Sequence, residues 1–218
     1  MADHTSPAHA NDPDRPNAAG VTRRRHIGLF LFDGVEELDA VGPWEVLAYW
    51  TQQHPEDGWN VSCVSADGGP VLGAKNLTLG AHHSIPGAPT WDVLIHPGGA
   101  GTRRLLRDPD HLDWVRQQRA TVPLMASVCS GSLVYAAAGL LTGRPATTHW
   151  ASLNLLAELD PTVITDVDAR FVDDGDVVTS AGVSAGIDMA LHLVARFAGT
   201  ARAREVRREI QYDPHPPV

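Results

Sequence analysis

The sequence predicts an α/β protein in which a mostly parallel, twisted sheet is sandwiched between helices. Short, nearly continuous apolar runs alternate along the chain with longer segments of helix-forming residues. This alternation is the pattern of strand–helix–strand units, which place parallel strands in one sheet. The apolar runs are typical of strands buried on both faces, so helices are expected on both sides of the sheet.

The expected strands are short and are bounded by turn residues. The first, over residues 26–32, ends at Asp33-Gly34, and a strand over 91–96 runs into the Gly-rich segment 97–101. Further strands are expected over 60–66 and 124–128, a small hairpin over 71–79, and a β pair formed by 169–172 and 177–181.

The expected helices fill the intervals between these strands. They lie over 35–50 with a break at Gly42-Pro43, from Asp108 or Asp110 to Gln118, and over 133–138, 151–159, 184–198 and 201–210. The break is expected because proline removes a helical hydrogen bond and clashes with the preceding turn. Gly139 follows the 133–138 segment in the position of a C-terminal cap.

Composition narrows the class of protein. With 218 residues, 43% of them hydrophobic, the chain is long enough for one domain with a substantial core. The formal net charge of −9 argues against a nucleic-acid partner. Two cysteines do not form a disulfide framework, and they favour a cytoplasmic location. No run approaches the ~18 consecutive apolar residues of a membrane span, so no membrane association is expected.

Residues 1–25 are expected to form a disordered N-terminal extension, and residues 26–218 a single domain. The extension is rich in Pro, Asp, Asn, His and Ala and contains almost no large apolar side chains. Its closing arginines and the apolar run that follows are superficially similar to a twin-arginine export signal. That run ends after six residues, at Asp33, so a first strand is the better interpretation.

One stretch of the chain has the pattern of a nucleophile elbow. Cys129 lies where the 124–128 strand passes directly into a helix, and the residues at 130–132 are all small. Such a tight turn lifts a reactive side chain above the sheet. The nearby helix start is expected to lower the pKa of the thiol and favour the thiolate. A buried cysteine that only fills space is the alternative, and this stretch alone leaves both open.

Two other segments are expected to meet Cys129. In parallel sheets, ligands bind beyond the carboxyl ends of the strands. The segments 33–39 and 97–101 also follow predicted strands, so all three gather at one edge of the sheet. The Gly-rich segment can offer backbone N–H groups to developing negative charge, although it lacks the patterns of nucleotide-binding loops. This convergence favours a catalytic Cys129.

The segment 33–39 brings carboxyl groups to this edge. Glu36 and Asp39 are about one helical turn apart and therefore share a face. A carboxyl that is desolvated beside a thiol has a raised pKa and can act as a general acid. Glu37 is expected to be solvated at the start of the helix.

His149, twenty residues after Cys129, suggests a Cys–His pair. The alternative is a polar core histidine anchored by the hydroxyl groups of the neighbouring threonines, and both interpretations stay open. The histidines of the chain show no metal-ligand spacing, so no metal is expected.

Six motifs resemble the ThiJ/PfpI superfamily, which has a flavodoxin-like, class I glutamine-amidotransferase-like fold. They are ELDAVGP (37–43), HPGGAG (96–101), SVCSGS (127–132), AAGLLTG (137–143), ATTHW (146–150) and TSAGVSAGID (179–188). Together they span roughly residues 26–213. Glutamine amidotransferases have a Glu where this chain has Ala151, and PfpI-type peptidases have a His where it has Ser130. The chain is most similar to the branch that hydrates isonitriles to N-substituted formamides. Its closing segment, 211–217 (QYDPHPP), also resembles that branch.

The resemblance implies a reaction and its main participants. Cys129, as a thiolate, attacks the isonitrile carbon, and Asp39 delivers a proton to give a thioimidate. Water then adds, and collapse releases the formamide and Cys129. No cofactor is implied.

The resemblance also implies supporting roles and an assembly. Backbone N–H groups near Gly99 and Ala100 stabilise the bound ligand, Ser130 tunes the thiolate, and His149 assists. The family usually forms homodimers with the site near the interface. Two alternatives remain: another cysteine-dependent reaction such as glyoxalase-type hydration, and a non-catalytic ligand or redox sensor related to the N-terminal domains of AraC-type regulators, which carry a further C-terminal DNA-binding domain.

Overall fold

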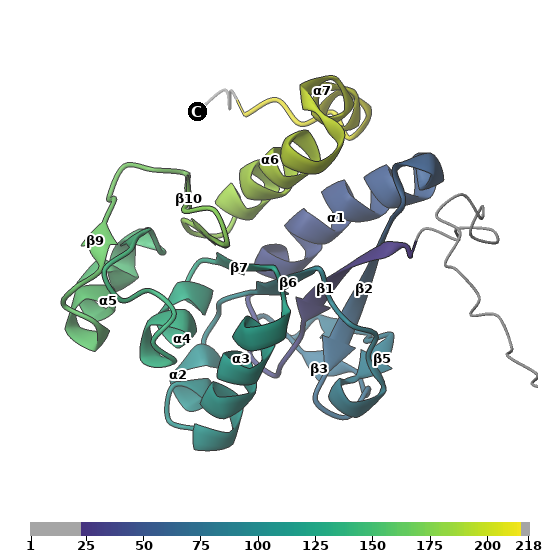
Figure 1. Cartoon of the computed structure of the whole chain (residues 1–218). Helices are drawn as coiled ribbons and strands as arrows, with labels where there is room; N and C mark the ends of the chain where they lie inside the picture. Colours follow the sequence, from purple (N-terminus) through teal and green to yellow (C-terminus); the bar gives the residue numbers. More distant parts are fainter. Residues whose placement is uncertain (1–22, 215–218) are drawn as a thin grey trace, which may run out of the picture.

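A twisted seven-stranded sheet forms the centre of the computed structural model, which describes residues 23–214 (Figure 1). Its strands are, in spatial order, β10 (Phe171–Asp173), β11 (Val177–Ser180), β7 (Leu124–Val128), β6 (Val93–His96), β1 (Arg25–Phe30), β2 (Trp59–Ser65) and β5 (His83–Ser84). Every neighbouring pair is parallel except β10 and β11, which are antiparallel. The predicted α/β class, with its mostly parallel sheet, is confirmed.

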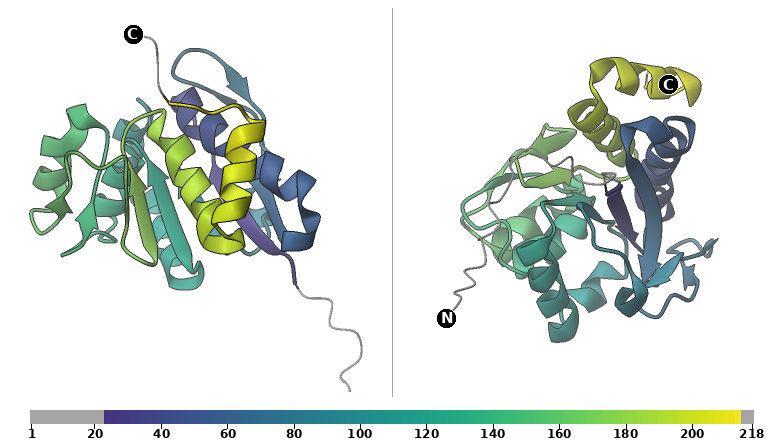
Figure 2. Two further views of the ribbon diagram at one scale, coloured as in Figure 1. Left: turned by 90° about the horizontal axis from the view of Figure 1, so that it is seen from above. Right: turned by 45° about the vertical axis from the view of Figure 1, so that its right-hand side comes forward.

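Helices cover both faces of the sheet (Figures 1 and 2). One face carries α1 (Glu37–Gln53), α6 (Ala185–Ala198) and α7 (Thr200–Glu209). The other carries α2 (Thr102–Leu105), α3 (Pro109–Thr121) and α4 (Gly131–Ala137), with α5 (Leu153–Leu159) packed on α4. Asp108 caps α3 by accepting hydrogen bonds from two N–H groups of the first turn. None of the helices within residues 23–214 is long and apolar enough to cross a membrane.

The remaining elements are short. The predicted hairpin is formed by β3 (Val71–Leu72) and β4 (Thr78–Leu79), and a parallel pair by β8 (Pro145–Ala146) and β9 (Ile164–Thr165). The 3₁₀ turns are η1 (Pro55–Asp57), η2 (Ile85–Gly87) and η3 (Trp150–Ser152).

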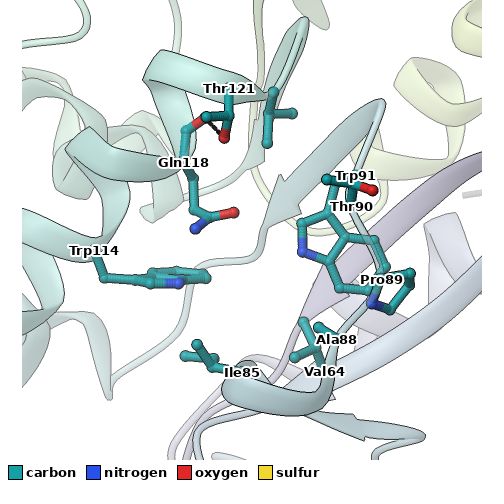
Figure 3. A pocket seen from close by; sticks show the side chains of 10 residues that line it. Val64, Ile85, Ala88, Pro89, Thr90, Trp91, Trp114, Gln118 and Thr121 are labelled. Carbon is teal, nitrogen blue, oxygen red and sulfur yellow. Dashed lines mark hydrogen bonds between the residues drawn. The ribbon is translucent and has the colours of Figure 1, made fainter.

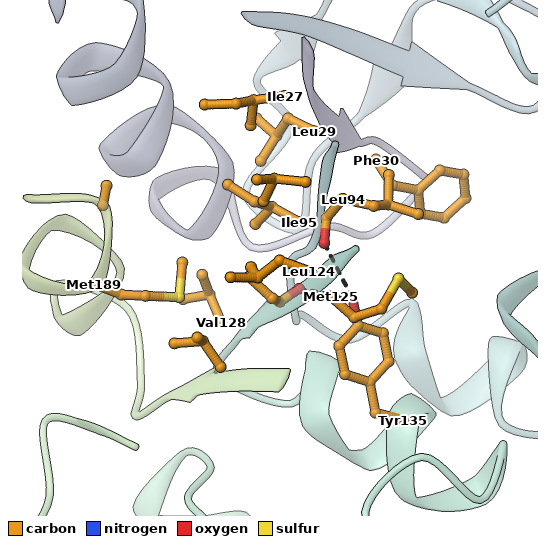
Figure 4. Packing of buried hydrophobic residues seen from close by; sticks show 14 of the residues in the cluster. Ile27, Leu29, Phe30, Leu94, Ile95, Leu124, Met125, Val128, Tyr135 and Met189 are labelled. Carbon is orange, nitrogen blue, oxygen red and sulfur yellow. Dashed lines mark hydrogen bonds between the residues drawn. The ribbon is translucent and has the colours of Figure 1, made fainter. Parts of the chain in front are cut away.

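The central strands are buried on both faces, as their apolar runs predict. Ile27 and Leu29 of β1 lie toward α1 and α6, whereas Phe30 lies on the opposite face (Figure 4). Full burial of one large apolar side chain contributes about 1.5–3 kcal/mol. Tyr135 of α4 is also fully buried, and its hydroxyl group donates to the Ala126 carbonyl at 2.7 Å. The buried polar atom is thereby satisfied, and α4 is fixed beneath β7.

The predicted break at Gly42-Pro43 is wrong, because α1 runs through it without interruption. Close packing against α6 explains the difference. A Cβ atom at Gly42 would lie 2.9 Å from Ile187, and one at Gly186 would lie 3.2 Å from Pro43. The two helices therefore approach through these small residues, and the apolar surface they bury offsets the ~3 kcal/mol that an interior proline costs.

The predicted disordered extension, residues 1–25, falls mostly outside the described residues. Within them, Arg25 is the first residue of β1, and the Arg23 guanidinium forms an ion pair with Asp92 at 2.8 Å. Strand β1 therefore begins one residue earlier than the predicted strand over 26–32.

Candidate active site

Cys129 occupies a strained turn between β7 and α4. Its φ angle is +57°, a conformation that non-glycine residues rarely adopt. Hydrogen bonds hold this backbone on both sides. The Cys129 N–H is shared between the carbonyls of Ser180 and Ala181, each at 3.1 Å, and its own carbonyl accepts from Ser132 Oγ and Thr148 Oγ1. The strain and its supports match the predicted nucleophile elbow.

The small residue at 131 is a steric requirement of this turn. A Cβ atom at Gly131 would lie 2.1 Å from the carbonyl oxygen of His96, at the end of the neighbouring strand. Only glycine allows α4 to start this close to β6. The predicted strand-end convergence is therefore realised in the backbone itself.

Asp39, in the first turn of α1, is completely buried beside Cys129. Its Oδ2 atom accepts a hydrogen bond from the Gly98 N–H at 2.9 Å. Oδ1 makes no well-formed hydrogen bond within residues 23–214, and the Cys129 thiol is the side chain that interacts with this carboxyl. Burial raises the pKa of Asp39 to about 7, against an ordinary value of 3.8.

The pKa of the Cys129 thiol is shifted in the opposite direction to the prediction. Burial, and then the negative charge of Asp39, raise the pKa of Cys129 to about 12. The backbone N–H groups of Ser130 and Val183 act in the other direction but do not outweigh burial. The prediction that Cys129 is present as a free thiolate is therefore wrong. Cys129 and Asp39 instead form a pair that holds one proton between them over a wide pH range.

Ser130 is tied to the Gly-rich segment. Its Oγ atom accepts from the Gly99 N–H at 3.0 Å and lies 3.2 Å from the hydroxyl of Thr102. The Gly99 N–H is therefore already used within the protein and does not offer the ligand contact expected of it. The Ala100 N–H makes no hydrogen bond to another described residue. Thr102, which sequence reasoning missed, also donates to the Gly99 carbonyl at 2.7 Å.

Glu36 and Glu37 do not line the site. Both face Lys75 in the loop between β3 and β4: the Lys75 ammonium pairs with Glu36, and the Lys75 N–H donates to Glu37 at 2.5 Å. The Glu37 side chain is only 12% exposed, so the expectation that it is solvated is wrong. These carboxylates attach the hairpin to the start of α1, and Asp39 alone of the acids in segment 33–39 reaches Cys129.

His149 does not pair with Cys129. Among the described residues no hydrogen bond joins the two, and His149 Nδ1 accepts instead from the Ala151 N–H at 3.2 Å. The half-buried ring meets Gly182 edge-on, and a Cβ atom there would lie 2.2 Å from His149 Cδ2. The Thr148 hydroxyl supports Cys129 and does not anchor the imidazole.

Figure 3 shows a pocket of 210 Å³ away from this site. Trp91 and Trp114 form two of its walls, and the amide of Gln118 lies between them. The pocket is beside the amino ends of β6 and β7, whereas Cys129 follows the carboxyl end of β7. It therefore does not contribute to the Cys129 site.

Fold and site together define an α/β protein with a strained cysteine at a strand–helix junction and a buried carboxyl beside it. The model of the DJ-1/PfpI family matches residues 25–196. The chain belongs to the DJ-1/PfpI family.

Several relatives are similar over most of the chain. An isonitrile hydratase from Pseudomonas putida is 40% identical over 88% of this chain and 80% of its own length. The HTH-type transcriptional regulator CdhR from Pseudomonas aeruginosa is 32% identical over 69% of this chain, but over only 44% of its own length. A solved structure of a ThiJ/PfpI family protein from Pseudomonas syringae has a TM-score of 0.79 and 30% identity, covering 96% of this chain and 85% of its own.

Proposed function

We propose that this protein hydrates an isonitrile, R–N≡C, to the N-substituted formamide, as a carbon–nitrogen lyase with Cys129 as nucleophile and Asp39 as general acid. The observation that carries the proposal is the buried Asp39–Cys129 pair, in which the pKa of the carboxyl is raised to about 7. The 40% identity to the isonitrile hydratase from Pseudomonas putida supports the choice of substrate.

In the first step, the pair transfers its shared proton to the substrate. Asp39 takes the thiol proton as the sulfur attacks the terminal isonitrile carbon, and a C–S bond forms. Asp39 then delivers that proton to the same carbon, which gives the thioimidate R–N=CH–S–Cys129. No net charge develops in the buried site, so the step avoids the cost of a new unpaired charge.

In the second step, water adds to the thioimidate carbon and the nitrogen gains a proton. The C–S bond then breaks, its electron pair returns to sulfur, and R–NH–CHO leaves. The last water proton restores the Asp39–Cys129 pair. The Ser130 N–H at the sulfur and the unused Ala100 N–H are the groups we assign to stabilising the sulfur and the bound substrate.

A neutral substrate suits this site. Isonitriles carry no net charge and a compact reacting end, so entering a buried site beside the Asp39–Cys129 pair has a small desolvation cost. Neither Gly98 nor Gly99 can carry a side chain: a Cβ atom would lie 2.5 Å from the Ser130 nitrogen in the first case and 2.2 Å from the Glu36 nitrogen in the second. The Gly-rich segment therefore packs against the acid and the elbow.

We further propose that the enzyme is a cytoplasmic homodimer formed by the single domain 26–218. Its two cysteines are both free within the structure, which suits a reducing compartment. Leu38 and Val41 on α1, and Leu72 and Leu77 on the hairpin, are exposed apolar side chains near the Asp39 segment. A second copy of the chain is the partner we assign to this surface.

Formamide production from a panel of alkyl and aryl isonitriles tests the proposed activity. The wild-type protein is expected to turn over at least one of them, and Cys129→Ala to abolish turnover while remaining folded. A wild-type protein inactive toward the whole panel contradicts the isonitrile assignment, and an active Cys129→Ala protein contradicts the nucleophile.

Assays on the same two proteins, wild type and Cys129→Ala, also distinguish two other functions. Glyoxalase-type hydration would appear as turnover of methylglyoxal in place of isonitriles. A sensor would bind ligand or oxidise at Cys129 without turnover. The 32% identity to the transcriptional regulator CdhR, over 44% of that regulator's length, supports the sensor as the second candidate.

A further inference from the structure

A second strained residue lies next to the first. Val183 has a φ angle of +52°, and a branched side chain makes this conformation more costly than at most other residues. Val183 follows β11, so it belongs to a different strand end from Cys129. Non-glycine residues held in such conformations cluster at functional sites, where the surrounding structure forces a particular backbone direction.

The turn at 182–183 directs a backbone donor toward the sulfur. The Cys129 N–H is bonded to the carbonyls of Ser180 and Ala181, which places this turn directly over the elbow. The N–H of Val183 acts on the Cys129 thiol from this side and lowers its pKa. The N–H of Ser130 does the same from the start of α4, so donors from two separate segments act on one sulfur atom.

His149 holds this turn from the outside. Its ring lies so close to Gly182 that a Cβ atom there would be 2.2 Å from Cδ2, well inside the contact distance. Nδ1 of the same ring also accepts a hydrogen bond from the Ala151 N–H. On the other side, the carbonyls of Gly182 and Val183 accept from the first N–H groups of α6, at 3.2 Å each. The turn is therefore clamped between His149 and α6.

We propose that His149 is a positioning residue whose ring holds the 182–183 turn, so that the Val183 N–H, together with the Ser130 N–H, stabilises negative charge on the Cys129 sulfur. The charge forms when Asp39 takes the thiol proton, and it forms again when the C–S bond breaks and its electron pair returns to sulfur. This inference rests on the Cys129 nucleophile of the proposed function, but not on the identity of the substrate. It assigns His149 a role that needs the flat ring and not its titratable nitrogen.

The reactivity of the thiol alone tests this role, without any isonitrile. In a Cys63→Ala background Cys129 is the one remaining cysteine. The rate of its alkylation by iodoacetamide at pH 8 reports the stabilisation of the thiolate. His149→Ala is expected to slow alkylation by ~10-fold, the effect of about one pKa unit. His149→Phe, which keeps a flat ring but no nitrogen, is expected to stay within about twofold of the parent protein.

Substitution at Gly182 provides a matched test of the contact. Gly182 does not have a positive φ angle, so Gly182→Ala strains only the contact with the His149 ring. We expect this variant to lose reactivity about as much as His149→Ala, and the double variant Gly182→Ala/His149→Ala to react faster than Gly182→Ala. Circular dichroism on each variant checks that it is folded.

Two results would overturn the inference. If His149→Phe is as slow as His149→Ala, an imidazole nitrogen is required and the ring contact alone does not hold the turn. If His149→Ala reacts at the parental rate, the ring does not position the donor. Absence of formamide production, with the expected alkylation pattern intact, would contradict the proposed function and leave this role standing.

Discussion

The backbone N–H of Gly98 donates to Oδ2 of Asp39 at 2.9 Å, and this bond joins the segment after β6 to the acid beside Cys129. A Cβ atom at residue 98 would lie 2.9 Å from the same oxygen and 2.5 Å from the Ser130 nitrogen. The Gly-rich segment therefore orients the proton donor, a different role from the ligand contact that a Gly-rich turn usually suggests.

Gly98→Ala is expected to reduce kcat/KM for an isonitrile by at least ~100-fold, because the methyl group displaces both Asp39 and the elbow. Far-UV circular dichroism checks that the variant keeps its secondary structure. Gly80→Ala is a matched control, since a Cβ atom there meets no other residue within 4 Å. Equal activity of the two variants would contradict the orienting role.

The pH dependence of kcat/KM is expected to rise through about pH 7 and then to level off. The pKa of Asp39 is raised to about 7, so below this pH both members of the Asp39–Cys129 pair are protonated. The reactive form, which holds one proton over two groups, accumulates as the first proton leaves. Initial rates at low substrate concentration from pH 5 to pH 9 check this. A profile that falls above pH 7 would show that the doubly protonated pair reacts.

Asp39→Asn is expected to lower turnover severely and to raise stability at alkaline pH. The folded state keeps its proton up to about pH 7, whereas the unfolded chain releases it near the ordinary value of 3.8. Between these values the folded state binds more protons, so burial of Asp39 makes the wild-type protein progressively less stable as pH rises, by up to ~4 kcal/mol. Urea unfolding is expected to show a larger gain for Asp39→Asn at pH 8 than at pH 4.

Acid is expected to destabilise the protein through a buried histidine pair. His96 Nε2 lies 3.0 Å from His111 Nε2, and burial lowers the pKa of the two rings to about 3 and about 4. The unfolded chain takes up protons near the ordinary value of 6.5, so stability falls as pH decreases from 6.5 toward 4. Thermal unfolding between pH 4 and pH 7 checks this, and His111→Leu should flatten the slope. An equally steep slope in that variant would contradict the assignment.

The sequence is sufficient to predict the meeting of Asp39 and Cys129, because it follows from where parallel strands end. The sequence does not predict the details that depend on side-chain packing. Pro43 stays helical because α6 approaches closely at Gly42, a contact between segments far apart in the chain. The thiol pKa is raised because burial outweighs the helix start, and sequence alone does not give the depth of burial.

The error at Glu37 and the two interpretations left open for His149 have a common cause. Both side chains were interpreted from their neighbours in the sequence, whereas their contacts are with the hairpin loop and with Gly182, respectively. The motif TSAGVSAGID supported the family resemblance but gave no sign that Val183 adopts a positive φ angle.

Hydrogen bonds from backbone N–H groups, two to carbonyls and one to the Glu37 carboxylate, join the hairpin to the segment that carries Asp39. The Gly34 N–H donates to Leu72, the Ala74 N–H donates to Val35, and the Lys75 N–H donates to Glu37. A force applied at the hairpin is thus transmitted to the first turn of α1, two residues from the proton donor. Loop exchanges, fusions or labels introduced at 73–77 are therefore expected to affect activity. They would displace the first turn of α1, which carries Asp39.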